Sequence, residues 1–171
     1  MDKNSIIDKE TFEVCTNAED HLKVFVCDKL IAPVIATLNK KGYKTFASCS
    51  GHYKIEYYEY LDEPIDKLKD YQKNNRIIIK EVRDNTFDYW IEVDSTTTYI
   101  LFSSRYDFES IPNDFYIENS DRTYIGSKTI FYDENGKHLK LADVSKKLSD
   151  KCRDLQKWAE NLPNINNDSF S

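Results

Sequence analysis

Apolar residues recur with helical spacing in two stretches of the chain and predict two amphipathic helices. The first stretch carries its apolar side chains on one helical face: Leu30, Ile31, Val34, Ile35 and Leu38. Asp28 can cap the start of this helix and Gly42 its end. The second stretch is longer and lies near the C-terminus: Leu141, Val144, Leu148, Cys152, Leu155, Ala159 and Leu162. A weaker pattern over residues 64–71 predicts a third helix.

Short β-branched and aromatic runs between turn residues predict the strands. Residues 77–82 and 87–93 flank a tight turn and favour a hairpin. Residues 97–102 form the most apolar run, which indicates a central position in the sheet. Other strands are expected at residues 43–47, 114–117, 122–125 and 129–132, whereas residues 53–60 are ambiguous. We therefore predict an α+β fold: a mixed, largely antiparallel sheet with two or three helices packed on it, the last helix being C-terminal.

Nothing in the sequence marks a boundary between domains. The 171 residues suit one domain, and no repeat or Gly/Ser-rich linker divides them. We expect a single domain over residues 1–171, with fraying at residues 1–20 and 163–171, where the patterning is weak and polar. No run approaches the roughly 20 apolar residues of a membrane span, and no signal-peptide core follows Met1. We therefore expect a cytoplasmic protein that does not enter membranes.

The cysteines bear on the redox compartment and on metal binding. They are Cys15, Cys27, Cys49 and Cys152. They lie far apart in a chain long enough to build a core, which favours free thiols in a reducing compartment. A zinc site needs several ligands, and Cys49 with His52 is the one close pair, because His21 and His138 are distant in sequence. We therefore expect neither a metal nor a cofactor.

Charge is unevenly distributed along the chain. The net charge of −6 disfavours direct nucleic-acid binding, because such binding depends on clustered Lys and Arg. Residues 107–121 contain acids and no basic residue; the acids are Asp107, Glu109, Asp114, Glu118 and Asp121. Either these acids are ordinary solvated surface charge, or they bind a protein partner with a basic surface. The oligomeric state is left open.

Two polar segments follow apolar strand candidates. The first is Ser48, Cys49, Ser50, Gly51 and His52, and the second is Ser103, Ser104 and Arg105. Gly51 permits a positive φ, with which successive N–H groups can point at an anion, and Arg105 can grip a carboxylate or phosphate. If the strands ending at Ala47 and Phe102 lie side by side and run parallel, both segments share one edge of the sheet. The sequence then predicts a ligand-binding site at that edge.

Cys49 has two interpretations. It is a nucleophile if His52 or Arg105 ionises its thiol, because the thiolate is the reactive form. Alternatively, it is an inert thiol in a turn at a strand end, where Ser48 and Ser50 satisfy the backbone and His52 forms ordinary hydrogen bonds. The order of residues reveals no carboxylate partner for this pair, so we assign no residue a catalytic role.

Residues 30–52, LIAPVIATLNKKGYKTFASCSGH, resemble a segment of small uncharacterised proteins of low-GC Gram-positive bacteria, their phages and their mobile elements. Those proteins often continue with a YIxF strand and an acidic loop, as this chain does at residues 99–107. Residues 48–51 also resemble the SCSGR segment of the wybutosine-synthesis methyltransferase family, which modifies a tRNA base with S-adenosylmethionine. This chain has His52 where that family has Arg, so the fixed cation of the family's segment is missing.

Two functions are compatible with these features. The first is a non-enzymatic binding or regulatory protein, encoded by a phage or mobile element, that inhibits a nucleic-acid-handling host or defence protein by protein contact. Tyr and Phe are frequent interface anchors, and no complete catalytic constellation is visible. The alternative is an enzyme or small-ligand binder that acts on a nucleotide or RNA base through the SCSGH segment. We favour the first.

Overall fold

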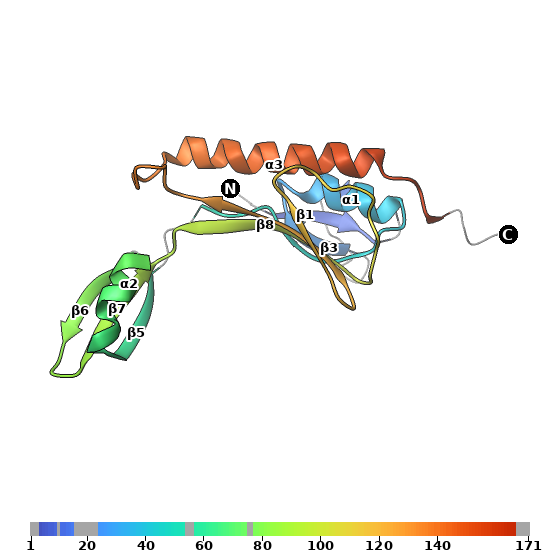
Figure 1. Ribbon diagram of the computed structural model, residues 1–171. Coiled ribbons are helices and arrows are strands. Elements are labelled where there is room, and N and C mark those ends of the chain that lie inside the picture. The colour runs from blue at the N-terminus through green and yellow to red at the C-terminus, as the bar shows by residue number, and fades with distance from the viewer. Residues whose placement is uncertain (1–3, 10, 16–23, 54–56, 75–76, 167–171) are drawn as a thin grey trace. The chain divides into compact units, whose positions relative to one another are not determined.

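A computed structural model describes residues 4–9, 11–15, 24–53, 57–74 and 77–166 (Figure 1). The chain forms two compact units. Unit 1 consists of Met1–His52, Thr96–Thr129 and Lys140–Ser171, and unit 2 consists of Tyr53–Ser95 and Ile130–Leu139. A compact unit need not fold alone. The single domain expected over residues 1–171 therefore stays a prediction.

Helices and antiparallel strand pairs occur together in the described residues, which confirms the predicted α+β class. The strands wholly or mostly in unit 1 are β1 (Asn4–Asp8), β2 (Val14–Cys15), β3 (Val24–Asp28), β4 (Thr45–Cys49), β8 (Ser95–Phe102), β9 (Tyr116–Asn119) and β10 (Thr123–Ile130). Those of unit 2 are β5 (Tyr57–Pro64), β6 (Ile77–Val82) and β7 (Thr86–Glu92). The helices are α1 (Ala32–Lys40) and α3 (Leu141–Asn161) in unit 1, with η1 (Ile65–Lys67) and α2 (Leu68–Asn74) in unit 2.

Unit 1 places helices on one side of its strands. The strands form a sheet of order β2-β1-β3 and a sheet of order β4-β8-β10-β9. Helices α1 and α3 pack on each other and lie on the same side of these strands (Figure 1). The core between the helices and the strands includes Ile7 of β1, Ile100 and Phe102 of β8, and Ile125 of β10. Because β8 lies between β4 and β10, the central position predicted for residues 97–102 is confirmed.

The first predicted helix is confirmed as α1, but its predicted start is wrong. The N-cap residue is Ile31, whose apolar side chain makes no capping bond. Asp28 is not the cap, because its carboxylate accepts hydrogen bonds from Ser50 instead. At the other end, Gly42 has a φ of 98° and its N–H donates to the carbonyl of Asn39 at 3.0 Å. Gly42 therefore ends the helix as predicted, in the left-handed conformation that glycine tolerates best.

The C-terminal helix is confirmed as α3, with Cys152 buried on its apolar stripe. Of the ends expected to fray, residues 1–3, 10, 16–20 and 167–171 lie outside the described residues, and some of the others are held in place. Residues 4–8 form β1, which pairs with both β2 and β3, and its Ile7 is fully buried. Near the C-terminus, the N–H of Ile165 donates to the carbonyl of Lys41 at 2.9 Å. Residues at both ends of the chain thus contribute to the packing of unit 1.

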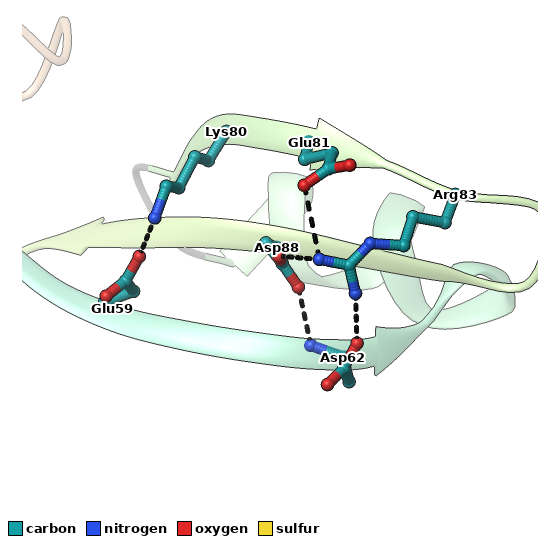
Figure 2. Close-up of polar contacts among 6 residues, drawn as sticks. All are labelled: Glu59, Asp62, Lys80, Glu81, Arg83 and Asp88. Carbon is teal, nitrogen blue, oxygen red and sulfur yellow. Dashed lines mark hydrogen bonds and ion pairs between the residues drawn. The ribbon is translucent and has the colours of Figure 1, made fainter.

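Unit 2 is a three-stranded sheet of order β5-β7-β6 with α2 on one face. The predicted hairpin is confirmed by the antiparallel pair β6–β7, and the helix predicted at residues 64–71 is confirmed as η1 and α2. Tyr71 of α2 packs its ring on Phe87 and Tyr89. Charged side chains from all three strands pair with one another in this sheet (Figure 2).

Several predicted strands shift in the structure. Residues 53–60, which are ambiguous in sequence, begin β5 only at Tyr57. The strands expected at 122–125 and 129–132 are one continuous strand, β10, as far as Ile130. Among the described residues, no helix is both long enough and apolar enough to cross a bilayer.

Candidate functional site

Two strands of unit 1 end beside each other and bring polar side chains together. Asp28 is the last residue of β3, and Cys49 is the last residue of β4. The Oδ2 atom of Asp28 accepts hydrogen bonds from the N–H of Ser50 at 2.8 Å and from its hydroxyl at 3.2 Å. The Nε2 atom of His52 lies 3.2 Å from the same oxygen. The carboxylate of Asp28 is therefore the centre of this cluster.

Cys49 completes the cluster. Its Sγ atom, a carboxylate oxygen of Asp28 and a ring nitrogen of His52 all lie within 4.8 Å of one another. Burial raises the pKa of the Cys49 thiol, and the negative charge of Asp28 raises it further, while the N–H of Gly51 donates to Sγ at 3.3 Å and partly opposes the shift. A thiol with a raised pKa is protonated at neutral pH. The geometry therefore favours an inert thiol over a nucleophile.

The backbone of the SCSGH segment is held by its own unit. Gly51 has the predicted positive φ, 84°, and a Cβ atom there would lie 2.8 Å from Cδ2 of Leu148. The N–H of His52 donates to Oγ1 of Thr96 at 3.0 Å, and Oγ1 of buried Thr98 donates to the carbonyl of Ser50 at 2.9 Å.

These bonds contradict the predicted anion site. The N–H of Ser50 is bound to Asp28, that of Gly51 to Cys49 and that of His52 to Thr96. Each of these three N–H groups therefore already has an acceptor within the chain and is not available to an anion. A negative ligand would also be repelled by the carboxylate at the centre of the cluster.

The predicted meeting of the two loops is wrong. Strands β4 and β8 do lie side by side, but they run antiparallel, with Cys49 opposite Tyr99 and Thr45 opposite Phe102. The segment after β8, Ser103, Ser104 and Arg105, therefore lies at the beginning of β4, where the N–H of Ser103 donates to the carbonyl of Lys44 at 2.8 Å. Four residue steps along a strand place this end about 13 Å from Cys49. Arg105 pairs there with Asp107 at 3.3 Å.

Asp28 is the site residue that sequence reasoning missed. The segment Val24–Asp28 was not expected to be a strand, and Asp28 was interpreted as a helix cap. The available signal was its position directly after a short apolar run, VFVC, at residues 24–27. A carboxylate at the end of a strand is placed where sites are often built.

The five acids expected to bind a partner occupy two places in unit 1. Asp107 and Glu109 border a cavity of about 440 Å³ that the rings of Tyr43, Tyr106 and Phe108 also line. The other three lie in or beside the edge strand β9: Asp114 before it, Glu118 within it and Asp121 after it. The carbonyl oxygen of Asp114 accepts a hydrogen bond from the hydroxyl of Ser127 at 2.6 Å. Their binding to a partner stays a prediction.

A row of aromatic rings crosses the side of the four-stranded sheet that faces away from α1 and α3. Alternation along β8 and β10 points Ile100 and Ile125 into the core, so their neighbours Tyr99 and Tyr124 point to the other side. The ring centroids of Tyr99 and Tyr124 are 5.6 Å apart, and Tyr116 of β9 follows at 5.9 Å. We call Tyr99, Tyr124 and Tyr116 the aromatic row.

Gly126 and Phe46 are two further features of the four-stranded sheet. Gly126 leaves room for the ring of Tyr124, because a Cβ atom at Gly126 would lie 2.6 Å from that ring. Phe46 of β4 is 63% exposed, and the guanidinium of Arg122 lies over its ring at 4.4 Å. Tyr99 lies opposite Cys49 in the β4–β8 pair, so the aromatic row borders the Asp28 cluster.

Comparison with known proteins finds no match: no family model, no curated protein and no solved structure is similar to the chain. The two resemblances noted in the sequence therefore stay predictions. Any function must be argued from the geometry described above.

Proposed function

We propose that this chain is a non-enzymatic binding protein that contacts a protein partner through the aromatic row and Phe46. The exposure of these rings on the four-stranded sheet carries the proposal. Phe46 on β4 and Tyr116 on β9 are 63% and 45% exposed, and Tyr99 and Tyr124 lie on the two strands between them. Tyr and Phe supply large contact areas with few rotatable bonds, which suits them to the centre of an interface.

Acidic residues beside the aromatic row favour a partner with a basic surface. Glu118 lies next to Tyr124, and Asp121 follows in the turn after β9. The whole chain carries a net charge of −6. Acidic groups beside aromatic anchors steer a basic partner into contact and repel phosphate groups. An inhibitor that occupies the nucleic-acid groove of a host or defence protein, encoded by a phage or mobile element, is one concrete form of this function.

The alternative, an enzyme or small-ligand binder acting on a nucleotide or RNA base, has less support. It rests on the SCSGH segment acting together with Arg105, and these groups lie at opposite ends of β4. The raised pKa of Cys49 also keeps its thiol protonated. We further propose a cytoplasmic location, which the free thiols of Cys27, Cys49 and Cys152 support.

The experiment compares two double variants as immobilised baits in a lysate of a Gram-positive bacterium. Phe46→Ala with Tyr116→Ala removes the two most exposed rings of the proposed surface. Ile78→Ala with Val82→Ala is the matched control, because these side chains are 51% and 55% exposed in unit 2. We expect the wild type and the control to retain the same basic protein, released by raised salt.

Each retained protein is then purified and its Kd is measured against all three baits. The Phe46 and Tyr116 variant should bind at least about tenfold more weakly, because it loses two aromatic anchors that each cost more than about 1 kcal/mol, and about 1.4 kcal/mol is already tenfold. Equal Kd values for the three baits would contradict the proposal. The proposal would also be contradicted if every protein retained by the wild type were retained equally by the Phe46 and Tyr116 variant.

A further inference from the structure

We propose that Asp28, Cys49 and His52 bind a divalent transition-metal ion, with Zn²⁺ the best match, and leave one coordination position open to solvent. The inference is independent of the proposed protein contact. It rests on three different ligand atoms that lie within 4.8 Å of one another, contributed by two strand ends and the following turn. The sequence alone supplies the close pair of Cys49 and His52 but no third ligand.

The distances suit a tetrahedral ion. Ligand atoms around tetrahedral Zn²⁺ are about 3.3 to 3.6 Å apart, given bond lengths of about 2.0 to 2.3 Å. The Nε2 atom of His52 and the Oδ2 atom of Asp28 already lie at 3.2 Å. The side chain of His52 is 49% exposed and can move to admit the ion, whereas Asp28, at 16%, is held in place. Because the three ligand atoms lie within 4.8 Å of one another, binding requires a shift of roughly 1 Å, which the exposed imidazole can supply.

The types of ligand select the metal. One thiolate, one imidazole and one carboxylate match Zn²⁺ and related transition metals, whereas Ca²⁺ and Mg²⁺ prefer sites made of oxygen atoms. Three protein ligands with a fourth position for water or another group are typical of zinc sites that remain accessible. Because His52 is half exposed, solvent can reach that fourth position.

The surrounding hydrogen bonds orient the ligands. The N–H and hydroxyl of Ser50 both donate to Asp28, and the N–H of Gly51 donates to the Sγ atom of Cys49. Such outer contacts fix metal ligands and tune their affinity. In the metal-free protein, a Cys49 thiolate would face the negative charge of Asp28, and this conflict favours the protonated thiol. A divalent cation removes this conflict, and the thiol proton leaves to solvent when the metal binds.

The experiment is a titration of the reduced full-length chain with Co²⁺, which reports thiolate ligation through a ligand-to-metal absorption band, followed by displacement with Zn²⁺. We expect one equivalent of Co²⁺ per chain. Cys49→Ser should abolish the thiolate band, and His52→Gln should weaken binding by at least about 100-fold, since the loss of an outer contact alone costs about 10- to 100-fold. Because His52 is half exposed, His52→Gln should keep the melting temperature of the wild type, which separates loss of binding from loss of fold.

Two control variants carry the same residue types away from the cluster. Cys27→Ser alters a free thiol on β3, and His138→Gln alters an imidazole of unit 2. Both should retain the band and the stoichiometry. The proposal is overturned if the wild type shows no thiolate band with Co²⁺, if the band survives Cys49→Ser, or if it is lost instead in variants of Cys15, Cys27, His21 or His138.

Discussion

Both units of the molecule use a carboxylate on one strand to hold the backbone of a neighbouring segment. In unit 2, Asp88 of β7 accepts a hydrogen bond from the N–H of Asp62, a residue with a φ of 56° in the irregular part of β5. In unit 1, Asp28 of β3 accepts one from the N–H of Ser50, next to Gly51 with its φ of 84°. The two bonds are 2.7 and 2.8 Å long.

The remaining partners of the two carboxylates differ. Asp88 also accepts a hydrogen bond at 2.7 Å from the guanidinium of Arg83, which is charged at any ordinary pH (Figure 2). Asp28 meets a protonated thiol and a half-exposed imidazole instead. A permanent cation neutralises the carboxylate of unit 2, whereas the carboxylate of unit 1 retains the capacity to bind one. The Asp88 cluster of unit 2 is therefore structural, and the Asp28 cluster of unit 1 is the better candidate for a function.

The largest effect we predict is at Gly51. Gly51→Ala should lower the free energy of unfolding by about 2 to 5 kcal/mol, because a positive φ costs a non-glycine residue about 1 to 2 kcal/mol and overpacking adds about 1 to 3. The new Cβ atom would lie 2.8 Å from Leu148 and 3.2 Å from both Thr96 and Thr98. Urea denaturation measures this change.

Gly136→Ala in unit 2 is the matched control for Gly51→Ala. Gly136 has a φ of 73° in the turn between Asp133 and Lys137, so its substitution should cost only the conformational term of about 1 to 2 kcal/mol. The comparison fails if the two substitutions cost the same. The segment that follows Asp28 would then be no more tightly packed than an exposed turn.

A smaller effect is predicted when each carboxylate becomes an amide. Asp88→Asn should lower the free energy of unfolding by about 1 to 2 kcal/mol, because it removes a charge-assisted bond from Arg83. Asp28→Asn should cost less than about 1 kcal/mol, since the amide oxygen can still accept from Ser50 and no fixed cation loses its partner. Thermal or urea unfolding of the two variants under the same conditions measures the difference. Equal losses would mean that Asp28 is as structural as Asp88.

Local patterns predict the elements of this fold well. The stripe from Leu141 to Leu162 and the runs on either side of residues 83–86 each contain their own periodicity, and both the helix and the hairpin form where expected. Strand β1 was not expected because its apolar residues, Ile6 and Ile7, are only two and lie among polar ones. Its position in a sheet depends on pairing with β2 and β3, which no local pattern contains.

The candidate site depends on such long-range pairing. Whether β4 and β8 run parallel or antiparallel decides which loop lies beside Cys49, and the hydrophobic patterns of the two strands are compatible with either. The antiparallel pairing moves Arg105 away, and the end of β3 brings Asp28 close instead. The SCSGH segment could therefore be recognised from sequence as a candidate site, but Asp28 as its neighbour could not.

The smallest predicted effect concerns the reactivity of Cys49 in the metal-free protein. If Asp28 contributes to the raised pKa of this thiol, Asp28→Asn should lower the pKa, and alkylation by iodoacetamide at neutral pH should become several-fold faster. The rate should rise with pH in both proteins and should reach its plateau at a lower pH in the variant. Mass spectrometry of the modified peptide, with a chelator present, measures both rates.

Cys152 is the internal control, since burial raises its pKa to about 12 and it should react slowly in either protein. An unchanged rate at Cys49 would show that burial alone sets its pKa, and the contrast with Asp88 would lose its electrostatic basis.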